Sequence, residues 1–477
     1  MAIKFGTDGW RAIIDEDFNE ENVALATQAI ADYCNESGKK SFVIGYDLRK
    51  KADVFAKICA EVMAGNGIKV YLVDSPCATP VTSWSIIDKK ADGGIMFTAS
   101  HNPPEFLGLK LKTEEGMVTP NSVTDELSKA IEGFKPEDIK QENFDKAKLS
   151  GKIEVFDPTP SYFNKLKELV DIKKIKKSNL KVLLNPMYSV GTKYLPELLA
   201  NGNIHVDIIN GEPDPNFGGK SPEPIVEKNV EDAIEKMKSG DFDVCLSFDG
   251  DADRIGLIDE KGKMITSLEA FLLLAYYLVT IKKEKGPMVE TISNTVMVRN
   301  LGKKLGFKVE EVKVGFKYVN EKMKEIKAIL GGEESGGSAI SGFILDRDAQ
   351  LMNLFILDLM VTLNKSLTEI LKLAEEEAGG GYQFRREDVH FPYEGYDELK
   401  TTKTAELTAN PPKDILGKKV VQTRSDDGIK FYFDDGAWLL IRFSGTEPVL
   451  RLYAEAKTME EVDKLIGFSK DFFSPNK

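Results

Sequence analysis

An alternation of strand-like and helix-like segments runs through most of this chain and constrains its fold more than any other feature. Short apolar runs predict strands, and segments with apolar residues at helical spacing predict the helices between them. This order favours layered α/β domains with mixed, parallel-rich sheets. The strands are predicted at 42–46, 70–73, 94–97, 182–184, 206–209, 244–248, 288–292 and 309–312, and the helices at 22–31, 54–65, 194–200, 230–238, 269–278 and 297–305.

The alternation comes in three rounds, and each round ends in a loop of unusual composition: the first loop contains Ser100, the second begins at Asp249, and the third is 331–337. The rounds share an order of elements and not a sequence, so they predict three similarly built domains. After a linker at 378–381, a smaller α+β domain is expected, because strands are predicted at 430–433, 438–442 and 449–454 and a helix at 459–468.

Length and composition agree with several soluble domains. A chain of 477 residues is far longer than one core needs. We predict three α/β domains and a C-terminal α+β domain around a central cleft, with bounds at 1–150, 151–256, 257–376 and 381–477.

Charge and cysteine content exclude some classes of partner. The net charge of −13 argues against a non-specific nucleic-acid binder. The longest apolar run, near 270–280, is too short to span a bilayer, so no membrane partner is expected. Four scattered cysteines without CxxC pairing, and no visible signal peptide, predict a reducing, cytoplasmic location.

The sequence DGDADR at 249–254 follows the apolar run 244–248 and is the strongest chemical signal. Alternate residues at the tip of an extended chain point the same way, so Asp249, Asp251 and Asp253 are expected to converge. Three carboxylates suit a hard cation such as Mg²⁺. Arg254 indicates that an anion, a phosphate, comes close to the cation.

Two other interpretations of this run are weaker. An EF-hand calcium loop fits the spacing, with Glu260 as the twelfth residue, but Arg254 replaces the required glycine and strands flank the run. A simple polar turn would leave three close carboxylates that repel one another without a compensating charge. The metal site is therefore favoured.

The first unusual loop, TASHNPP at 98–104, presents Ser100 on a segment stiffened by two prolines. A stiff loop with one hydroxyl suits a nucleophile or a phosphate carrier. His101 is adjacent and is expected to point away from Ser100 on an extended segment, which disfavours a Ser–His hydrolase. The alternative is a capped turn, with Ser100 and Asn102 bonded to the backbone. Lys110 lies on the next extended stretch and is placed to return toward this loop.

Two further loops offer polar groups for a ligand. The sequence GGEESGG at 331–337 has carboxylate and hydroxyl acceptors suited to sugar hydroxyls, or is a glycine-rich surface loop, and both interpretations stay open. The sequence RFSGTEP at 442–448 offers a guanidinium, two hydroxyls and an exposed backbone N–H, which favours an oxyanion cradle over a simple turn.

Together with FGTDGWR at 5–11, these four loops in this order resemble the α-D-phosphohexomutase superfamily over nearly the whole chain. That superfamily includes phosphoglucomutases, phosphomannomutases and phosphoglucosamine mutases. The resemblance implies an isomerase that moves a phosphoryl group between O1 and O6 of glucose and/or mannose phosphates. It also implies Mg²⁺, a phosphorylated serine and a bound hexose 1,6-bisphosphate. Small hexose phosphates are then the partners, and the choice between monomer and homodimer stays open.

The resemblance also implies roles for individual residues. At the reacting end it implies that Ser100 carries the phosphoryl group and binds Mg²⁺ together with Asp249, Asp251 and Asp253. Beside the reacting phosphate it implies Arg11, Lys110 and Arg254, with Lys110 a candidate for proton transfer. At the other end it implies that Glu333 and Ser335 bind the sugar hydroxyls, that Lys313 or Lys317 helps to choose substrate orientation, and that the distal phosphate is held by Arg442, Ser444, Gly445 and Thr446.

One position departs from the family pattern. Gly337 stands where many members have a histidine at the end of the sugar loop, so the choice among glucose, mannose and glucosamine stays open. A phosphoglucosamine mutase is the main alternative. A non-catalytic sugar-phosphate-binding protein and a Mg²⁺-dependent phosphatase are more remote alternatives.

Overall fold

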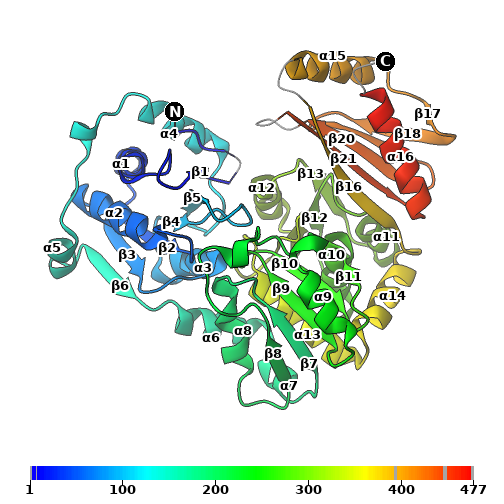
Figure 1. Ribbon diagram of the computed structural model, residues 1–477, viewed down its shortest axis with the longest axis horizontal. Helices are drawn as coiled ribbons and strands as arrows, with labels where there is room; N and C mark the ends of the chain where they lie inside the picture. The colour runs from blue at the N-terminus through cyan, green and yellow to red at the C-terminus, as the bar shows by residue number, and fades with distance from the viewer. Residues whose placement is uncertain (1–2, 7, 392–394, 444–447, 474–477) are drawn as a thin grey trace.

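The computed structural model of the chain describes residues 3–6, 8–391, 395–443 and 448–473. Within them, separate sheets follow one another along the chain, as the change of colour from blue to red in Figure 1 shows. The first three sheets mix parallel and antiparallel pairs, and the last is antiparallel throughout. This confirms the predicted fold class. No helix in the described ranges is long and apolar enough to cross a membrane.

The first domain is built on a sheet with strand order β1-β5-β4-β2-β3-β6, in which β4, β2, β3 and β6 run parallel. Val43 packs against Ile86 of α3, whereas Phe42 and Ile44 of the same strand join the core on the other face. Burial on both faces explains why β2 is a continuous apolar run. The elements are β1 (Trp10–Ile13), α1 (Glu20–Glu36), β2 (Ser41–Tyr46), α2 (Ala52–Gly65), β3 (Lys69–Val73), α3 (Thr79–Lys89), β4 (Gly93–Phe97), β5 (Phe106–Thr113), α4 (Asn121–Ile131), a 3₁₀ helix (Pro136–Asp138), α5 (Phe144–Leu149) and β6 (Ile153–Phe156).

The second domain has the strand order β11-β10-β9-β7-β8, with β9, β7 and β8 parallel. Leu183 and Cys245 pack under α9, whereas Val182 and Leu246 face the main core. The elements are α6 (Thr159–Leu169), α7 (Ile172–Lys176), β7 (Lys181–Asn185), α8 (Tyr194–Leu199), β8 (His205–Ile208), α9 (Glu231–Lys238), β9 (Val244–Phe248), β10 (Ile255–Asp259), β11 (Met264–Ile265) and 3₁₀ helices at Val190–Thr192, Phe217–Gly219 and Glu227–Asn229.

The third domain has the strand order β13-β12-β14-β15, and only the β14–β15 pair is antiparallel among its described pairs. Val289 packs under α12, and Met288 beside it faces the main core. The elements are α10 (Ser267–Tyr276) with a π-helical extension (Tyr277–Ile281), β12 (Met288–Thr291), α11 (Val296–Leu305), β13 (Val309–Val312), α12 (Phe316–Ile326), β14 (Leu330–Gly332), β15 (Ser338–Ile340), α13 (Ala349–Leu363) and α14 (Leu367–Glu377).

The predicted domain bounds can be compared with these sheets. β6 lies beyond residue 150 and pairs with β3 in the first sheet. β10 and β11 continue past residue 256 and pair in the second sheet. The first two sheets therefore extend a few residues beyond the bounds expected from the sequence.

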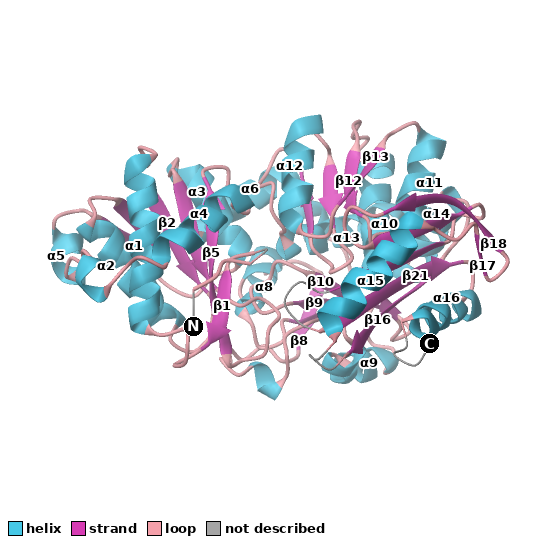
Figure 2. Ribbon diagram, turned by 90° about the horizontal axis from the view of Figure 1, so that it is seen from above, coloured by secondary structure: helices cyan, strands magenta, loops and turns pink. Residues whose placement is uncertain are grey.

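The C-terminal domain is an antiparallel sheet of order β16-β21-β20-β19-β18-β17. Leu439 and Ile441 pack with α16, whereas Trp438 and Leu440 join the main core on the opposite face. Figure 2 shows this sheet and the first-domain sheet toward opposite ends of the molecule. The elements are β16 (Gln383–His390), α15 (Tyr396–Ala409), β17 (Asp414–Ile415), β18 (Lys418–Arg424), β19 (Ile429–Phe433), β20 (Trp438–Phe443), β21 (Val449–Ala456) and α16 (Met459–Phe472).

The three unusual loops occupy the same place in their domains. Each follows a strand that has a parallel neighbour on one side, and leads to the next strand, which returns antiparallel on the other side. The register closes at Phe97–Leu109 around the serine loop (98–105) and at Phe248–Ile255 around the aspartate loop (249–254). In the third domain it closes at Gly332–Ser338, around the glycine-glutamate loop (333–337). Each loop therefore leaves its sheet at the carboxyl end of a strand, where α/β folds place their binding sites.

Candidate active site

The aspartate loop is a tight turn. The Oδ1 atom of Asp249 accepts the backbone N–H groups of Asp253 and Arg254 at 2.9 and 3.1 Å, and Ala252 has a left-handed φ of 53°. One oxygen from each of Asp249, Asp251 and Asp253 can be chosen so that all three lie within 4.8 Å of one another. The three carboxylates therefore converge as expected. A tight turn brings them together, however, and not the alternation of side chains along an extended strand.

These carboxylates fit a hard divalent cation. The Oδ1 atoms of Asp251 and Asp253 are buried and have no hydrogen-bond partner in the part of the chain that the structure describes. Burial raises the pKa of Asp249 well above its usual range, and the charges of Asp253 and Asp251 add to this effect. Burial would also raise the pKa of Asp251, but the nearby Lys110 ammonium outweighs it and lowers that pKa. Buried, unpartnered carboxylate oxygens are the ligands that Mg²⁺ prefers.

Ser100 faces the aspartate loop across the boundary between the first two domains. Its buried Oγ donates to Asp249 Oδ2 at 2.8 Å, and its backbone has a left-handed φ of 54°. The two loops meet closely, because a Cβ at Gly250 would lie 2.4 Å from the carbonyl oxygen of Ser100. Strained backbone of this kind often occurs at functional sites.

His101 differs from the prediction. Its Nδ1 lies 3.4 Å from Ser100 Oγ, because the left-handed turn at Ser100 replaces the extended segment that would have separated the two side chains. Burial lowers the pKa of His101 well below its usual value, and the neighbouring Arg254 and Arg11 charges lower it further. The imidazole is therefore neutral near pH 7.

Arg49 holds the serine loop, and no pattern in the sequence identified it. Its two terminal nitrogens donate to the carbonyl oxygens of Ser100, Asn102 and Pro103 at 2.7 Å and of Phe106 at 2.9 Å. The loop is thus fixed by a buried guanidinium as well as by its prolines.

Lys110, on β5, was predicted to return toward the serine loop, and its described contacts are with the aspartate loop and Asp8. Its Nζ lies 2.8 Å from Asp251, 3.3 Å from Asp253 and 3.2 Å from Asp8, and the side chain is 1% exposed. Burial alone would lower the pKa of Lys110, but Asp251 and Asp8 outweigh it and raise the pKa. Lys110 is therefore protonated at neutral pH. Asp8 was not identified from the sequence, although it lies in the quoted run 5–11.

Two predicted arginines lie beside the serine and aspartate loops. Arg11 donates to Asn102 Oδ1 at 2.5 Å and to the Ala99 carbonyl at 3.2 Å. The buried Nε of Arg254 lies 3.9 Å from Asp249 and 3.7 Å from Asp253. Guanidinium groups around a hydroxyl and a carboxylate cluster suit a phosphoryl group.

The glycine-glutamate loop (333–337) of the third domain joins this cluster. The carbonyl oxygen of Gly336 accepts the backbone N–H of Ile255 at 3.1 Å, which ties this loop to the strand that follows the aspartate loop. Glu333 is buried, and Ser335 Oγ lies 3.5 Å from its Oε2. Burial raises the pKa of Glu333 to about 7.

Arg347 is a second cation that sequence reasoning missed. It lies 2.8 Å from Asp8, 3.1 Å from Asp253 and 3.6 Å from Glu333. It therefore connects side chains from the first three domains. Its only sequence signal is the charged triplet 346–348 before an apolar helix.

The predicted phosphate clamp is not joined to this cluster. Arg442 on β20 donates from Nε to Asp427 at 2.9 Å. Among the described residues, no hydrogen bond or ion pair links it to the serine or aspartate loop. Lys313 is exposed, whereas Lys317 is buried and bonded to Asn121 of the first domain. Three further predicted clamp residues, Ser444, Gly445 and Thr446, lie outside the described residues.

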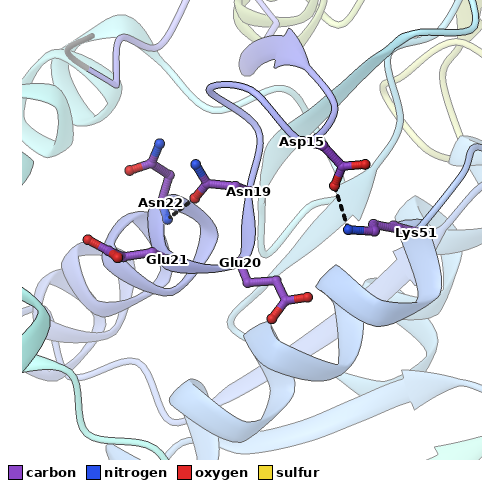
Figure 3. Close-up of a pocket in the computed structure, with 6 residues that line it drawn as sticks. All are labelled: Asp15, Asn19, Glu20, Glu21, Asn22 and Lys51. Carbon is purple, nitrogen blue, oxygen red and sulfur yellow. Dashed lines mark hydrogen bonds and ion pairs between the residues drawn. The ribbon is translucent and has the colours of Figure 1, made fainter.

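A separate hollow of about 430 Å³ lies near the start of α1 (Figure 3). Lys51 pairs with Asp15 there, and Asn19 Oδ1 accepts the Asn22 N–H at 2.9 Å as a helix cap. These polar groups serve the local fold, so the hollow is not a candidate site. Its lining residues are Asp15, Asn19, Glu20, Glu21, Asn22 and Lys51.

The family comparison covers most of the chain. The phosphoglucomutase/phosphomannomutase family matches with its alpha/beta/alpha domain I at residues 2–137, domain II at 160–262, domain III at 268–377 and its C-terminal domain at 399–467.

Individual proteins agree with this match. A phosphoglucomutase/phosphomannomutase from Thermococcus kodakarensis is 32% identical over 97% of this chain and 96% of its own. A phosphoglucosamine/phosphogalactosamine mutase from Sulfurisphaera tokodaii is 28% identical over 98% of both. The crystal structure of a putative phosphomannomutase from Thermus thermophilus superposes with a TM-score of 0.85 over 99% of both chains, at 28% identity. The chain is therefore an enzyme of the isomerase class and belongs to the phosphoglucomutase/phosphomannomutase family of the α-D-phosphohexomutase superfamily.

Proposed function

We propose that this enzyme moves a phosphoryl group between O1 and O6 of a hexose phosphate through Ser100. The observation that carries the proposal is the 2.8 Å contact between Ser100 Oγ and Asp249, inside a buried cluster of carboxylates and cations. Phosphoryl transfer depends on positioning and on stabilising charge, and this cluster is built for both.

The proposed cycle begins with phosphorylated Ser100. The bond between Ser100 Oγ and phosphorus breaks as the free sugar hydroxyl bonds to phosphorus, which gives a hexose 1,6-bisphosphate. Lys110, held protonated, is the candidate donor of a proton to the serine oxygen, and it takes up the proton that the sugar hydroxyl releases. The net proton transfer is therefore from the sugar hydroxyl to Ser100. The bisphosphate then reorients within the site, and its other phosphate is transferred to Ser100.

Residues from the first two domains support this exchange. Arg11 and Arg254 bind oxygens of the transferring group, and burial of the loops limits its hydrolysis by water. Mg²⁺, when held by Asp249, Asp251 and Asp253, would neutralise charge on that group.

The other end of the substrate requires a second set of residues. We assign Glu333 and Ser335 to the sugar hydroxyls. The distal phosphate is assigned to Arg442, Ser444, Gly445 and Thr446, with Lys313 or Lys317 nearby. Among the described members of this set, Arg442 is on the C-terminal domain, so movement of that domain is expected to bring it to the substrate.

Substrate choice among glucose, mannose and glucosamine phosphates is the finer question. The relatives include a protein named for glucose and mannose and a protein named for amino sugars, at 32% and 28% identity. A panel of the three hexose 1-phosphates, each with a catalytic amount of the hexose 1,6-bisphosphate, measures kcat/KM for each. The largest kcat/KM identifies the substrate.

Ser100→Ala tests the mechanism, with Ser239→Ala, at an exposed serine, as the control. We expect Ser100→Ala to lose turnover and its exchangeable phosphate in mass spectrometry while keeping its fold. Near-normal interconversion of glucose 1- and 6-phosphate by this variant would refute the proposal. Phosphate release that exceeds isomerisation in the wild type would favour a phosphatase, and binding without turnover would favour a sugar-phosphate-binding protein.

A further inference from the structure

Arg347 fills the space that a side chain at Gly337 would occupy. A Cβ at position 337 would lie 2.3 Å from Cδ and 2.7 Å from Cγ of Arg347. Packed interiors do not tolerate such approaches, so no larger residue fits at 337 while Arg347 keeps its position. Gly337, which departs from the family pattern, therefore leaves the space that Arg347, ten residues further along the chain, occupies.

The backbone around Arg347 is anchored on both sides. Asp346 pairs with the buried Lys112 of the first domain. Asp348 caps α13, because its Oδ1 accepts the backbone N–H of Leu351 at 3.0 Å. With both neighbours fixed, the direction in which the Arg347 side chain leaves the chain is fixed as well.

The guanidinium is held among three carboxylates, of which Asp253 and Glu333 are buried and Asp8 is partly exposed. One terminal nitrogen lies 2.8 Å from Asp8 and 3.1 Å from Asp253, and the other lies 3.6 Å from Glu333. The ring of Phe316 lies against it, with Cζ 5.0 Å from the ring centroid. A planar fork is suited to holding carboxylates in a fixed relative geometry.

We propose that Arg347, in the space left by Gly337, is a positioning and specificity-determining residue that orients Glu333 toward the sugar and links it to the aspartate loop. This inference rests on the proposed function. It assigns sugar selection in this enzyme to a pair of positions, so that neither can change alone. A side chain at 337 and the arginine at 347 are alternative ways of filling one space.

A double-mutant cycle tests the pairing. With alanine at 347, only the Cβ of that residue remains near position 337. A Cβ at 337 would lie 3.7 Å from it, which is an ordinary contact. We expect Gly337→His and Arg347→Ala each to lower kcat/KM by about 10–100-fold. Gly337→His/Arg347→Ala should be about tenfold better than the product of the single effects predicts, since it removes the clash and refills the space.

The measurements separate positioning from folding. They are kcat and KM for the glucose, mannose and glucosamine 1-phosphates, the phosphate content of Ser100, and the melting temperature. We expect the ratio of kcat/KM among the sugars to change about tenfold in the double variant while Ser100 remains phosphorylated. Additive single effects, or unchanged sugar ratios, would overturn the inference.

A milder variant decides the matter if Arg347→Ala does not fold. Gly337→Ala keeps the guanidinium but displaces it, and Gly467→Ala, with open space around it, is the matched control. A lower kcat/KM with changed sugar ratios in Gly337→Ala supports the inference, and wild-type kinetics overturn it. A wild type that turns over none of the sugars would instead overturn the proposed function.

Discussion

Lys110 is the cation whose removal tests most directly how the aspartate loop is balanced. It lies within 3.3 Å of carboxylate oxygens of Asp8, Asp251 and Asp253 and is 1% exposed. Lys110→Met keeps a flexible apolar side chain of similar length but leaves these carboxylates with one cation fewer. We predict that the variant melts at a lower temperature and that Mg²⁺ raises its melting temperature more than it raises that of the wild type.

The magnitude follows from burial. Removing one partner of a buried ion pair costs about 3–5 kcal/mol. In a domain of about 150–250 residues, each kcal/mol of lost stability lowers the melting temperature by about 2–4 °C. The unfolding transition that includes the aspartate loop should therefore occur about 6–20 °C lower. Lys110 also binds two of the carboxylates that would hold the cation, through their Oδ2 atoms, so its positive charge opposes cation binding. Each tenfold gain in Mg²⁺ affinity on its removal corresponds to about 1.4 kcal/mol.

Lys112→Met is the matched control, since Lys112 lies two residues further along β5 and is buried against Asp346. Differential scanning calorimetry with EDTA and with Mg²⁺ resolves the separate steps of a multidomain chain. Both variants should melt at lower temperatures in EDTA, but only Lys110→Met should gain more from Mg²⁺ than the wild type. Equal Mg²⁺ gains in the two variants would refute the reasoning.

Three other changes probe the surrounding structure. Arg49→Lys should lower Ser100 phosphorylation and kcat about 10–100-fold, since an ammonium cannot span the four carbonyls, and mass spectrometry and turnover assays measure this. Asp427→Asn weakens the bond to Arg442, and an about tenfold rise in KM with kcat retained is expected in steady-state kinetics. Burial raises the pKa of Asp348 from 3.8 to about 7, so the folded protein holds a proton that the unfolded chain releases, and stability falls as pH rises between these values. Asp348→Asn should reduce that fall in melting curves, and an unchanged pH dependence would contradict it.

Much of the layered fold could be predicted because its strands are buried on both faces. Segments such as 42–46 and 244–248 are continuous apolar runs, which only a covered sheet explains. β16 could not be predicted in this way. Its sequence QFRREDVH is mostly polar, and it is an edge strand held by its pairing with β21 over eight residues. Edge strands need few apolar side chains, so their sequences carry little pattern.

The residues of the candidate site could likewise be predicted only in part. Ser100, Lys110 and the three aspartates lie in short motifs, and the structure brings them together. Asp8 lies in the run 5–11 and Arg347 in a charged triplet, but their contact spans 339 positions of sequence, and no local pattern identifies such a distant partner. His101 was misplaced because the sequence does not show that Ser100 has a left-handed backbone.

The charges of the site connect its parts. Ion pairs of 3.9 Å or less join six carboxylates to five cations, a formal excess of one negative charge. A phosphorylated serine adds about −1.5 to −2 charges and, alone, would face that excess in a buried setting. A divalent cation adds +2 and cancels most of the added charge. The phosphate and the cation are therefore expected to stabilise each other. The carboxylates are those of Asp8, Asp249, Asp251, Asp253, Glu333 and Asp346, and the cations are Arg11, Lys110, Lys112, Arg254 and Arg347.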